Sequence, residues 1–225
     1  MLQDVGVRVL SVLIGYVFGM FQTAYFYGKA HGIDIREHGS GNAGTTNTLR
    51  VLGKKAGLIV LLGDICKTIL AIMLVNVLFV YGRNPELRLL LTMYTGAGAV
   101  LGHDCPIYLK GRGGKGIAVT AGLVIAFDYH FLLMGILTFF LPFGLTGYVS
   151  LGSLVFYLIF VVQMIICGQC NLAGMEVLKQ SQKIEMYVIA VLLMAVAYYK
   201  HRANIVRLIK GEERKTHILK KKEES

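Results

Sequence analysis

A polar segment at residues 38–50, which reads HGSGNAGTTNTLR, has the composition of an anion-binding loop. It holds three Gly, two Asn, four Ser or Thr, one His and one Arg, and it lies between two long apolar runs. Glycine permits positive φ angles and close backbone approach. Hydroxyl and amide side chains supply short donors, and Arg50 carries a planar guanidinium suited to phosphate. We therefore expect this segment to hold an anion.

A second polar stretch, residues 102–116, reads GHDCPIYLKGRGGKG. It resembles a P-loop but does not match one, because Leu109 stands where the motif needs Gly and Gly116 where it needs Ser or Thr. What remains is a Gly-rich backbone with Lys115 as a point charge. A helix expected over 117–127 would add the partial positive charge of its N-terminus. The alternative is a basic loop that contacts lipid phosphates, and composition leaves both interpretations open.

The third stretch, residues 201–215, reads HRANIVRLIKGEERK. His201, Asn204 and Arg207 are spaced three apart, so a helix would place them on one face. A lone histidine at a helix end, such as His201 or His103, is more often a hydrogen-bonded cap than a catalyst. The run Lys220-Lys221-Lys222 is most simply a solvated segment near anionic lipid.

Asp64 and Lys67 lie three residues apart near the start of the second apolar run, hence on one helix face. Ionisable side chains within a membrane are a functional hypothesis by default. The alternative is a structural pair whose charges neutralise each other.

Several catalytic signatures are missing from the sequence. The basic side has no cluster of carboxylates that would form a magnesium site. No His is followed five positions later by Asp, and there is no G-x-S-x-G nucleophile elbow. The Cys167-x-x-Cys170 pair closes an apolar run and follows no βαβ pattern, which argues against a redox motif. We expect neither a metal nor a cofactor.

The elements that must position these stretches are membrane helices. The 225 residues are 55% hydrophobic and 16% charged, with a mean hydropathy of +0.62, outside the range of soluble domains. We expect one all-α integral membrane domain over residues 1–225. Its net charge of +10 indicates contact with anionic lipid headgroups or anionic substrates. Nucleic acid is not expected, because no basic soluble domain exists to bind it.

Apolar runs occupy about 5–27, 56–81, 87–102, 148–168 and 184–199. The segment between 117 and 145 has two interpretations. One is a single span over 117–141, which places Asp128 at its centre, where an unpaired charge is costly. The other is a pair of short, partly spanning segments, 117–127 and 131–145, that turn near Asp128.

Parity and charge favour the pair. With seven passes, all three polar stretches lie on one side, which then carries five, three and nine Lys or Arg in 28–55, 103–116 and 200–225, against five on the other side. The positive-inside rule places the basic side in the cytoplasm. We therefore expect an N-terminus outside, a basic cytoplasmic tail over about 200–225, and a site that faces the cytoplasm from the plasma membrane.

The three stretches together resemble the signature motifs of the bacterial acyl-phosphate:glycerol-3-phosphate acyltransferases. Gly63-Asp64-x-x-Lys67 is similar to the Asp–Lys helix of that family. The resemblance covers about residues 5–215, in order and with suitable spacing. The sequence departs from it at Ala43, where the family usually has Pro, and at Gly111, where an aromatic residue is common.

This resemblance implies transfer of a fatty acyl group from acyl phosphate to the 1-hydroxyl of glycerol 3-phosphate, which gives lysophosphatidate and phosphate. It implies membrane lipids as surroundings and a functional link to the enzyme that makes acyl phosphate. The site residues expected on the motifs fall into three groups. Expected catalytic residues are Ser40, Asn47, Arg50, Lys115, His201 and Asn204. Expected substrate-binding residues are Gly41, Asn42, Gly44, Thr45, Thr46, Gly113, Gly114, Gly116 and Arg207. Expected structural residues are Asp64, Lys67 and Glu213.

The chemistry of such a reaction suits these residue types. Acyl phosphate has a good leaving group, so the main task is to hold two phosphates and a carbonyl in line. Our hypothesis is that Arg50, Lys115 and Arg207 bind phosphates, that Ser40 and Asn47 orient the hydroxyl or oxyanion, and that the donor's own phosphate is the base. Two rivals stay open: a non-catalytic lipid-headgroup binder, and a transporter of an anionic metabolite, which predicts pseudo-symmetric halves that the sequence lacks.

Overall fold

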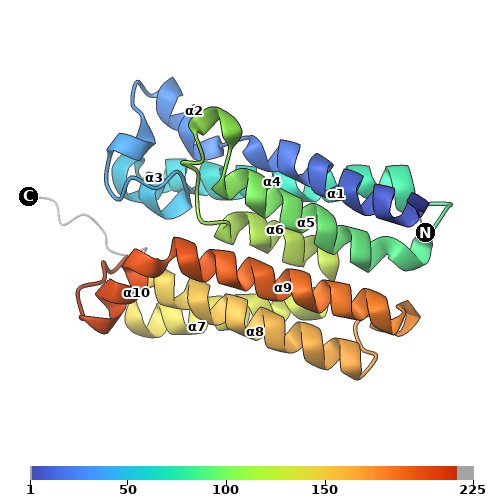
Figure 1. The fold of residues 1–225 in the computed structure, drawn as a ribbon. Helices are drawn as coiled ribbons and strands as arrows, with labels where there is room; N and C mark the ends of the chain where they lie inside the picture. The colour runs from blue at the N-terminus through green and yellow to red at the C-terminus, as the bar shows by residue number, and fades with distance from the viewer. Residues whose placement is uncertain (1, 217–225) are drawn as a thin grey trace, which may run out of the picture.

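The computed structural model describes residues 2–216, and within that range it is all-helical, with no β-strand (Figure 1). Its α-helices are α1 (Leu2–Met20), α2 (Thr23–Ala30), α3 (Thr45–Leu52), α4 (Lys54–Val75), α5 (Arg88–Asp104), α6 (Ile117–Phe127), α7 (Tyr129–Thr146), α8 (Val149–Gln169), α9 (Gln180–Lys200) and α10 (Arg202–Ile209). Between residues 2 and 216, five segments are long and apolar enough to cross a membrane: 5–30, 54–80 and helices α7, α8 and α9. The run Lys220–Lys222 lies outside the described residues.

The segment between 117 and 146 is a pair of helices that turn at Asp128. Helix α6 ends at Phe127, and Asp128 is extended, with φ −164°. Its carboxylate accepts a hydrogen bond from the backbone N of His130 at 2.9 Å, which caps the start of α7. The acidic residue therefore ends one helix and begins the next, so a single span over 117–141 is wrong.

Two segments differ from their expected course. The run expected over 5–27 breaks at Phe21 and Gln22 into α1 and α2, because the Gln22 side chain donates to the carbonyl of His103 at 2.8 Å and draws the chain inward. The polar segment 38–50, expected as an anion-binding loop, contains most of helix α3, which begins after its N-cap Gly44 and ends at Leu52, before its C-cap Gly53.

Helices α1 and α5 are in backbone contact through glycines. A Cβ added at Gly15 or Gly98 would lie 2.0 or 2.1 Å from a carbonyl oxygen of the opposite helix. Gly19 and Gly102, each one turn further on, are equally close to the opposite helix. This is the small-residue packing that holds helices together in lipid, where apolar burial drives association weakly. The four glycines therefore let the backbones of α1 and α5 come into direct contact.

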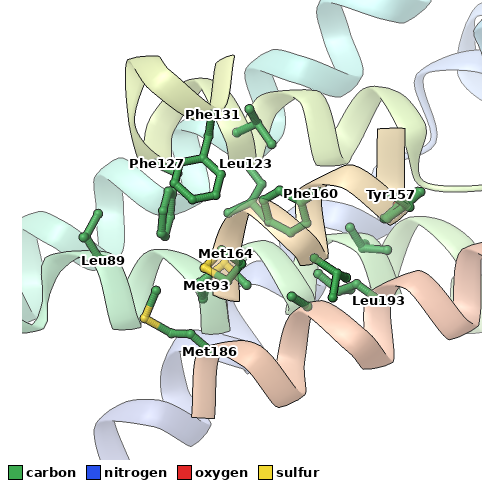
Figure 2. Close-up of a cluster of buried hydrophobic side chains, with 14 of the residues drawn as sticks. Leu89, Met93, Leu123, Phe127, Phe131, Tyr157, Phe160, Met164, Met186 and Leu193 are labelled. Carbon is green, nitrogen blue, oxygen red and sulfur yellow. The ribbon is translucent and has the colours of Figure 1, made fainter. Parts of the chain in front are cut away.

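The largest buried apolar cluster lies between α5, α6, α7, α8 and α9 (Figure 2). Leu89 and Met93 of α5 contribute to it, together with Leu123, Phe127, Phe131, Tyr157, Phe160, Met164, Met186 and Leu193. Phe131 meets Phe127 and Phe160 edge to face. This cluster fixes the 11-residue helix α6 against its longer neighbours.

All three polar stretches lie at one end of the bundle. Figure 1 shows α2, α3 and α10 at the end where α9 finishes, while the N-terminus lies at the opposite end. The stretch 105–116, which connects α5 to α6, lies at the same end as α2 and α3. Segments separated by more than 150 residues therefore share one surface.

Candidate active site

Glu213 is the centre of a hydrogen-bonded cluster that joins the third polar stretch to α8. Its Oε1 accepts from Asn204 Nδ2 at 2.6 Å and from Ser150 Oγ at 2.8 Å, and its Oε2 accepts from Arg207 Nε at 2.7 Å. Burial alone would raise the pKa of Glu213, but these three donors outweigh it and hold the pKa below its ordinary value. Glu213 is therefore a carboxylate that aligns Asn204 and Arg207.

Lys115 connects the second stretch to this cluster, because its Nζ donates to Asn204 Oδ1. Burial lowers the pKa of Lys115 to about 8; Glu213 opposes this shift, while Arg207 and Arg50 add to it. The amine is thus a cation near neutral pH that lies among other cations. A bound dianion would relieve that repulsion.

Arg50 comes to the same end of the bundle from α3. Its Nη2 donates to Thr216 Oγ1 at 2.9 Å and lies 3.5 Å from the carbonyl of Arg214. Burial and the neighbouring Arg214 lower the pKa of Arg50. The ordinary pKa of an arginine side chain is so high that the guanidinium remains charged. Arg50, Lys115 and Arg207 therefore bring a cation from each polar stretch to one region.

Asn47 holds the first loop in shape. Its Oδ1 accepts from the backbone N of Ser40 at 2.7 Å, and its Nδ2 donates to the carbonyls of Ile35 and His38 at 3.0 and 2.9 Å. The Asn47 side chain is buried, whereas Ser40 is exposed at the surface of the loop. The amide is saturated by backbone groups, so Asn47 positions Ser40.

The other residues of the first motif line the same loop. Gly41 has φ +72°, a conformation that favours glycine, and Gly44 is the N-cap of α3. Asn42, Thr45 and Thr46 are half-buried at the start of that helix. Backbone N–H groups at a helix start are unpaired donors.

The Gly-rich loop packs on the end of α5. A Cβ added at Gly113 would lie 2.0 Å from the carbonyl oxygen of His103, and one at Gly114 would lie 2.0 Å from the ring Nε2 of the same residue. Gly116 has φ +74° and is the N-cap of α6. Glycine is required at Gly113 and Gly114, where the backbone lies against His103, and at Gly116, where the chain turns into α6. Lys115 lies between these glycines, and its side chain contacts Asn204 in the Glu213 cluster.

A buried polar network lies beneath that loop. Lys67 Nζ donates to Asp64 Oδ1 at 2.8 Å, to the carbonyl of Phe21 at 2.7 Å and to His103 Nδ1 at 3.0 Å. Because His103 Nδ1 accepts a hydrogen bond from an ammonium group, it carries no proton and the imidazole is neutral. Thr23 Oγ1 also donates to Asp64, at 2.9 Å. Asp64 and Lys67 thus pair on one helix face and tie α4 to α2 and α5.

His201 caps the end of α9 and begins α10. Its Nδ1 contacts the carbonyl of Ala197 at 2.8 Å, so Nδ1 carries the proton and Nε2 is the acceptor. Burial and the charge of Lys115 lower the pKa of His201 to about 4. The imidazole is therefore neutral at physiological pH.

Three further residues at this end, Ser150, Thr216 and Asp104, were not among the expected site residues. Ser150 and Thr216 complete the contacts of Glu213 and Arg50. Asp104 is fully buried, and within residues 2–216 its carboxylate oxygens have no hydrogen-bond partner, while its carbonyl accepts from Lys200 Nζ at 2.6 Å. Only Asp104 had a local signal, as a carboxylate beside His103 in a polar stretch. In the described part of the chain, no group of three or more His, Cys, Asp or Glu side chains is arranged to hold a metal ion.

The membrane-crossing helices, with a cationic cluster at one end, define an integral membrane protein that acts on anionic substrates. The sequence matches the family described as glycerol-3-phosphate acyltransferase over residues 9–211. Glycerol-3-phosphate acyltransferase 2 of Bacillus cereus is 40% identical over 215 residues, covering 94% of this chain and 96% of the relative. A glycerol-3-phosphate acyltransferase of Clostridioides difficile is 38% identical over 209 residues, covering 92% and 94%.

Two crystal structures of PlsY (YgiH), an integral membrane glycerol 3-phosphate acyltransferase, resemble this fold. The glycerol 3-phosphate form superposes with a TM-score of 0.79 and the lysophosphatidic acid form with 0.76. Each is 28% identical to this chain and covers 94% of it and 96% of the solved chain. The chain belongs to the glycerol-3-phosphate acyltransferase family and is a multi-pass membrane enzyme.

Proposed function

We propose that this enzyme transfers a fatty acyl group from acyl phosphate to the 1-hydroxyl of sn-glycerol 3-phosphate, giving lysophosphatidate and inorganic phosphate, the first step of phospholipid synthesis. One observation carries the proposal: three cations from three distant stretches, Arg50, Lys115 and Arg207, gather at one end of a membrane bundle. Two phosphates must be held there, one on each substrate. The motifs, the family match and the structural neighbours support the same reaction.

We assign phosphate binding to the basic side chains and their positioning to the residues that hydrogen-bond to them. Arg50, Lys115 and Arg207 bind phosphate oxygens, and a guanidinium does so with two parallel hydrogen bonds. Asn204 and Glu213 position Lys115 and Arg207, since all four side chains belong to one hydrogen-bonded cluster. The backbone of Gly113, Gly114 and Gly116 lets the Lys115 loop lie against α5.

Within the first loop, Ser40 orients the acceptor hydroxyl or the oxyanion, and Asn47 acts on it through the backbone bond to Ser40 N. Backbone donors of Asn42, Thr45 and Thr46 add further contacts to the anion. The N–H groups of Gly41 and Gly44 donate to the carbonyls of His38 and Asn42, both at 3.0 Å, and so hold the loop that surrounds the anion. This division follows from exposure, because Ser40 is open to solvent and Asn47 is not.

Attack of the hydroxyl on the acyl carbonyl forms a C–O ester bond and breaks the bond between the carbonyl carbon and the phosphate oxygen. The proton of the hydroxyl passes to the departing phosphate, so the donor supplies its own base. Neutral His201 offers Nε2 as a hydrogen-bond acceptor at this end of the bundle. Catalysis then depends on positioning and on cations that stabilise the developing oxyanion.

The chain forms a single membrane domain of seven passes in the plasma membrane: α1, α4, α5, α6, α7, α8 and α9. The polar end faces the cytoplasm and the N-terminus lies outside, as the distribution of Lys and Arg supports. In a variant whose four native cysteines are replaced by serine, a cysteine introduced at Asn84 should react with an impermeant maleimide on intact cells, and one introduced at Arg112 should not. Labelling of both from outside would contradict a cytoplasmic site.

Purified protein in detergent tests the activity directly. We expect lysophosphatidate and phosphate from palmitoyl phosphate with glycerol 3-phosphate, and no product from palmitoyl-CoA. A thioester is a poorer leaving group and would favour a strong base at the acceptor hydroxyl. Transfer from palmitoyl-CoA alone would contradict the proposed donor, and absence of any lysophosphatidate would favour a transporter or a headgroup binder. The donor also requires a functional link to an enzyme that makes acyl phosphate.

A further inference from the structure

His103, the penultimate residue of α5, supports the Gly-rich loop with both its backbone and its ring. Its carbonyl accepts a hydrogen bond from the backbone N of Gly114 at 3.1 Å. A Cβ added at Gly114 would lie 2.0 Å from ring atom Nε2, 2.8 Å from Cε1 and 2.9 Å from Cδ2. The backbone of Gly114 therefore lies directly against the imidazole, and Lys115 is the next residue in the chain.

The His103 ring is buried and held at its other nitrogen by two separate parts of the bundle. Lys67 Nζ of α4 donates to Nδ1 at 3.0 Å, and the Nε2 of Gln22, at the break between α1 and α2, lies 3.4 Å from the same atom. Gln22 Nε2 also donates to the carbonyl of His103 at 2.8 Å. Because Nδ1 accepts from an ammonium group, the proton of the neutral ring is on Nε2, the atom that faces Gly114.

Lys67 is held in place by further contacts, so it prevents the ring from moving away from the loop. Its ammonium group has three protons, and these are directed at Asp64 Oδ1 at 2.8 Å, at the carbonyl of Phe21 at 2.7 Å and at the His103 ring. Thr23 Oγ1 donates to the same oxygen of Asp64 at 2.9 Å. Movement of the ring would leave a buried donor without a partner, which is costly. The loop must therefore adapt to the ring.

The position of the loop in turn decides where Lys115 lies. Its Nζ donates to Asn204 Oδ1 of α10, in the cluster centred on Glu213. A displacement at Gly114 reaches Lys115 through a single peptide unit, which is planar and rigid. Misplacement by about 1 Å of a group that holds a substrate can cost about 100-fold in rate.

We propose that His103 is a positioning residue for glycerol 3-phosphate: its ring, held by Lys67, sets the position of the Gly-rich loop and so places Lys115 at the phosphate of the substrate. This inference rests on the proposed role of Lys115 as a phosphate ligand. Glycine is needed at Gly114 to make room for the imidazole, and not to let a phosphate approach. The pair of Asp64 and Lys67, expected to be structural, thereby contributes to substrate binding.

Replacing Gly114 and His103 singly and together tests whether the two residues are coupled. Gly114→Ala places a methyl group against the held ring, and we expect it to raise the KM for glycerol 3-phosphate about tenfold, with a smaller change in kcat because a binding contact is affected. His103→Asn removes Nε2 and Cε1 but keeps an amide oxygen that can accept from Lys67. In that background, Gly114→Ala should raise the KM by no more than about twofold.

Gly113 offers a matched control one residue away. A Cβ added there would lie 2.0 Å from the carbonyl oxygen of His103 and 3.0 Å from that of Asp104. These are backbone atoms, and a change of the His103 side chain leaves them in place. Gly113→Ala should therefore raise the KM by the same factor in the wild-type and His103→Asn backgrounds. A general loss of stability would not relieve Gly114→Ala while sparing the effect of Gly113→Ala.

The part played by Lys67 is tested by a separate variant, which also decides the proposal if His103→Asn does not fold, as judged by size-exclusion chromatography in detergent. Asp64→Asn with Lys67→Met removes both charges, so no unpaired ion is left among the helices. The His103 ring then loses the donor at Nδ1 and is free to turn. We expect a higher KM for glycerol 3-phosphate in this variant, and Gly114→Ala should cost less in it than in the wild type.

The measurement is the initial rate of the purified full-length enzyme at saturating palmitoyl phosphate over a range of glycerol 3-phosphate concentrations. An equal cost of Gly114→Ala with and without the held ring would overturn the positioning role and indicate that Gly114 contacts the phosphate directly. A wild-type KM in Gly114→Ala would overturn it as well. If Lys115→Met kept the wild-type KM for glycerol 3-phosphate, the proposed phosphate role of Lys115 would fail, whatever the coupling between Gly114 and His103.

Discussion

Activity towards glycerol 3-phosphate should fall at alkaline pH because Lys115 loses its proton. Burial lowers the pKa of this amine to about 8 in the free enzyme. About nine-tenths of Lys115 is then protonated at pH 7 and about one-tenth at pH 9, and kcat/KM reports the groups of the free enzyme. The second pKa of a phosphate monoester is about 6, so the substrate is already a dianion across this range.

The other groups that face Lys115 do not titrate in this range, with one exception to control. Arg50 stays charged, Glu213 has its pKa below the ordinary value, and His201 has its pKa at about 4. The buried carboxyl of Asp104 is the remaining titratable neighbour. An Asp104→Asn variant therefore accompanies the profile and should keep the fall near pH 8.

The size of the effect follows from the contact that is lost. A hydrogen bond to a charged group contributes about 1.5–3 kcal/mol, or roughly 10- to 150-fold in kcat/KM. We expect Lys115→Met to lose about this factor at pH 7 and to show a flat profile from pH 7 to 9. We expect Lys115→Arg, whose guanidinium stays protonated, to lose the fall near pH 8 even if its activity is lower.

The assay is the initial rate of phosphate release at limiting glycerol 3-phosphate and saturating palmitoyl phosphate, corrected for spontaneous hydrolysis at each pH. A flat wild-type profile would refute the assigned titration. The same alkaline fall in Lys115→Met would show that another group causes it. Unchanged kinetics in Lys115→Met at limiting glycerol 3-phosphate would return this residue to the role of a lipid contact.

Three further predictions concern the residues that build the site. Arg50→Lys should lower activity at least tenfold, because the charge remains but the planar fork that also reaches Thr216 is lost; near-normal kcat/KM would mean that charge alone suffices. Glu213→Gln should lower the free energy of unfolding in detergent by about 1–3 kcal/mol, because a glutamine amide cannot accept from Ser150, Asn204 and Arg207 at once. An unchanged melting temperature would refute the stabilising role of the Glu213 cluster. Gly98→Val should be destabilised by about 1–3 kcal/mol, because its Cβ would lie 2.1 Å from a carbonyl of α1, whereas Gly144→Val, with open space, should melt like the wild type.

Much of the helical plan could be predicted from local patterns. Apolar runs give membrane helices because lipid leaves the backbone no other partners. Asp128 in the middle of such a run predicts a turn, since a lone charge there is costly, and the structure shows the turn at that residue. The spacing of three residues between Asp64 and Lys67 places them on one helix face and likewise predicts their contact, which the structure shows at 2.8 Å. These inferences succeed because the interacting groups are close in sequence.

The contacts that Asn47 and Gly114 make could not be predicted from local patterns. Asn47 has the residue type of a substrate ligand, but its amide is saturated by the backbone of its own loop. Gly114 resembles part of a phosphate loop, but the close approach that requires glycine there is to the ring of His103. A residue type limits what a side chain can bind, and its neighbours decide what it does bind.

The sequence by itself determined that polar stretches rich in Gly, Asn, Lys and Arg alternate with membrane helices, and which of them share a side. Tertiary structure alone decided that Glu213 accepts from Ser150, Asn204 and Arg207 at once, and that Arg8 meets Glu185 across α5. Arg8 and Glu185 are 177 residues apart, and no local periodicity encodes a contact at that distance. Such contacts exist only after the helices pack, because packing brings the ends of separate helices within hydrogen-bond range.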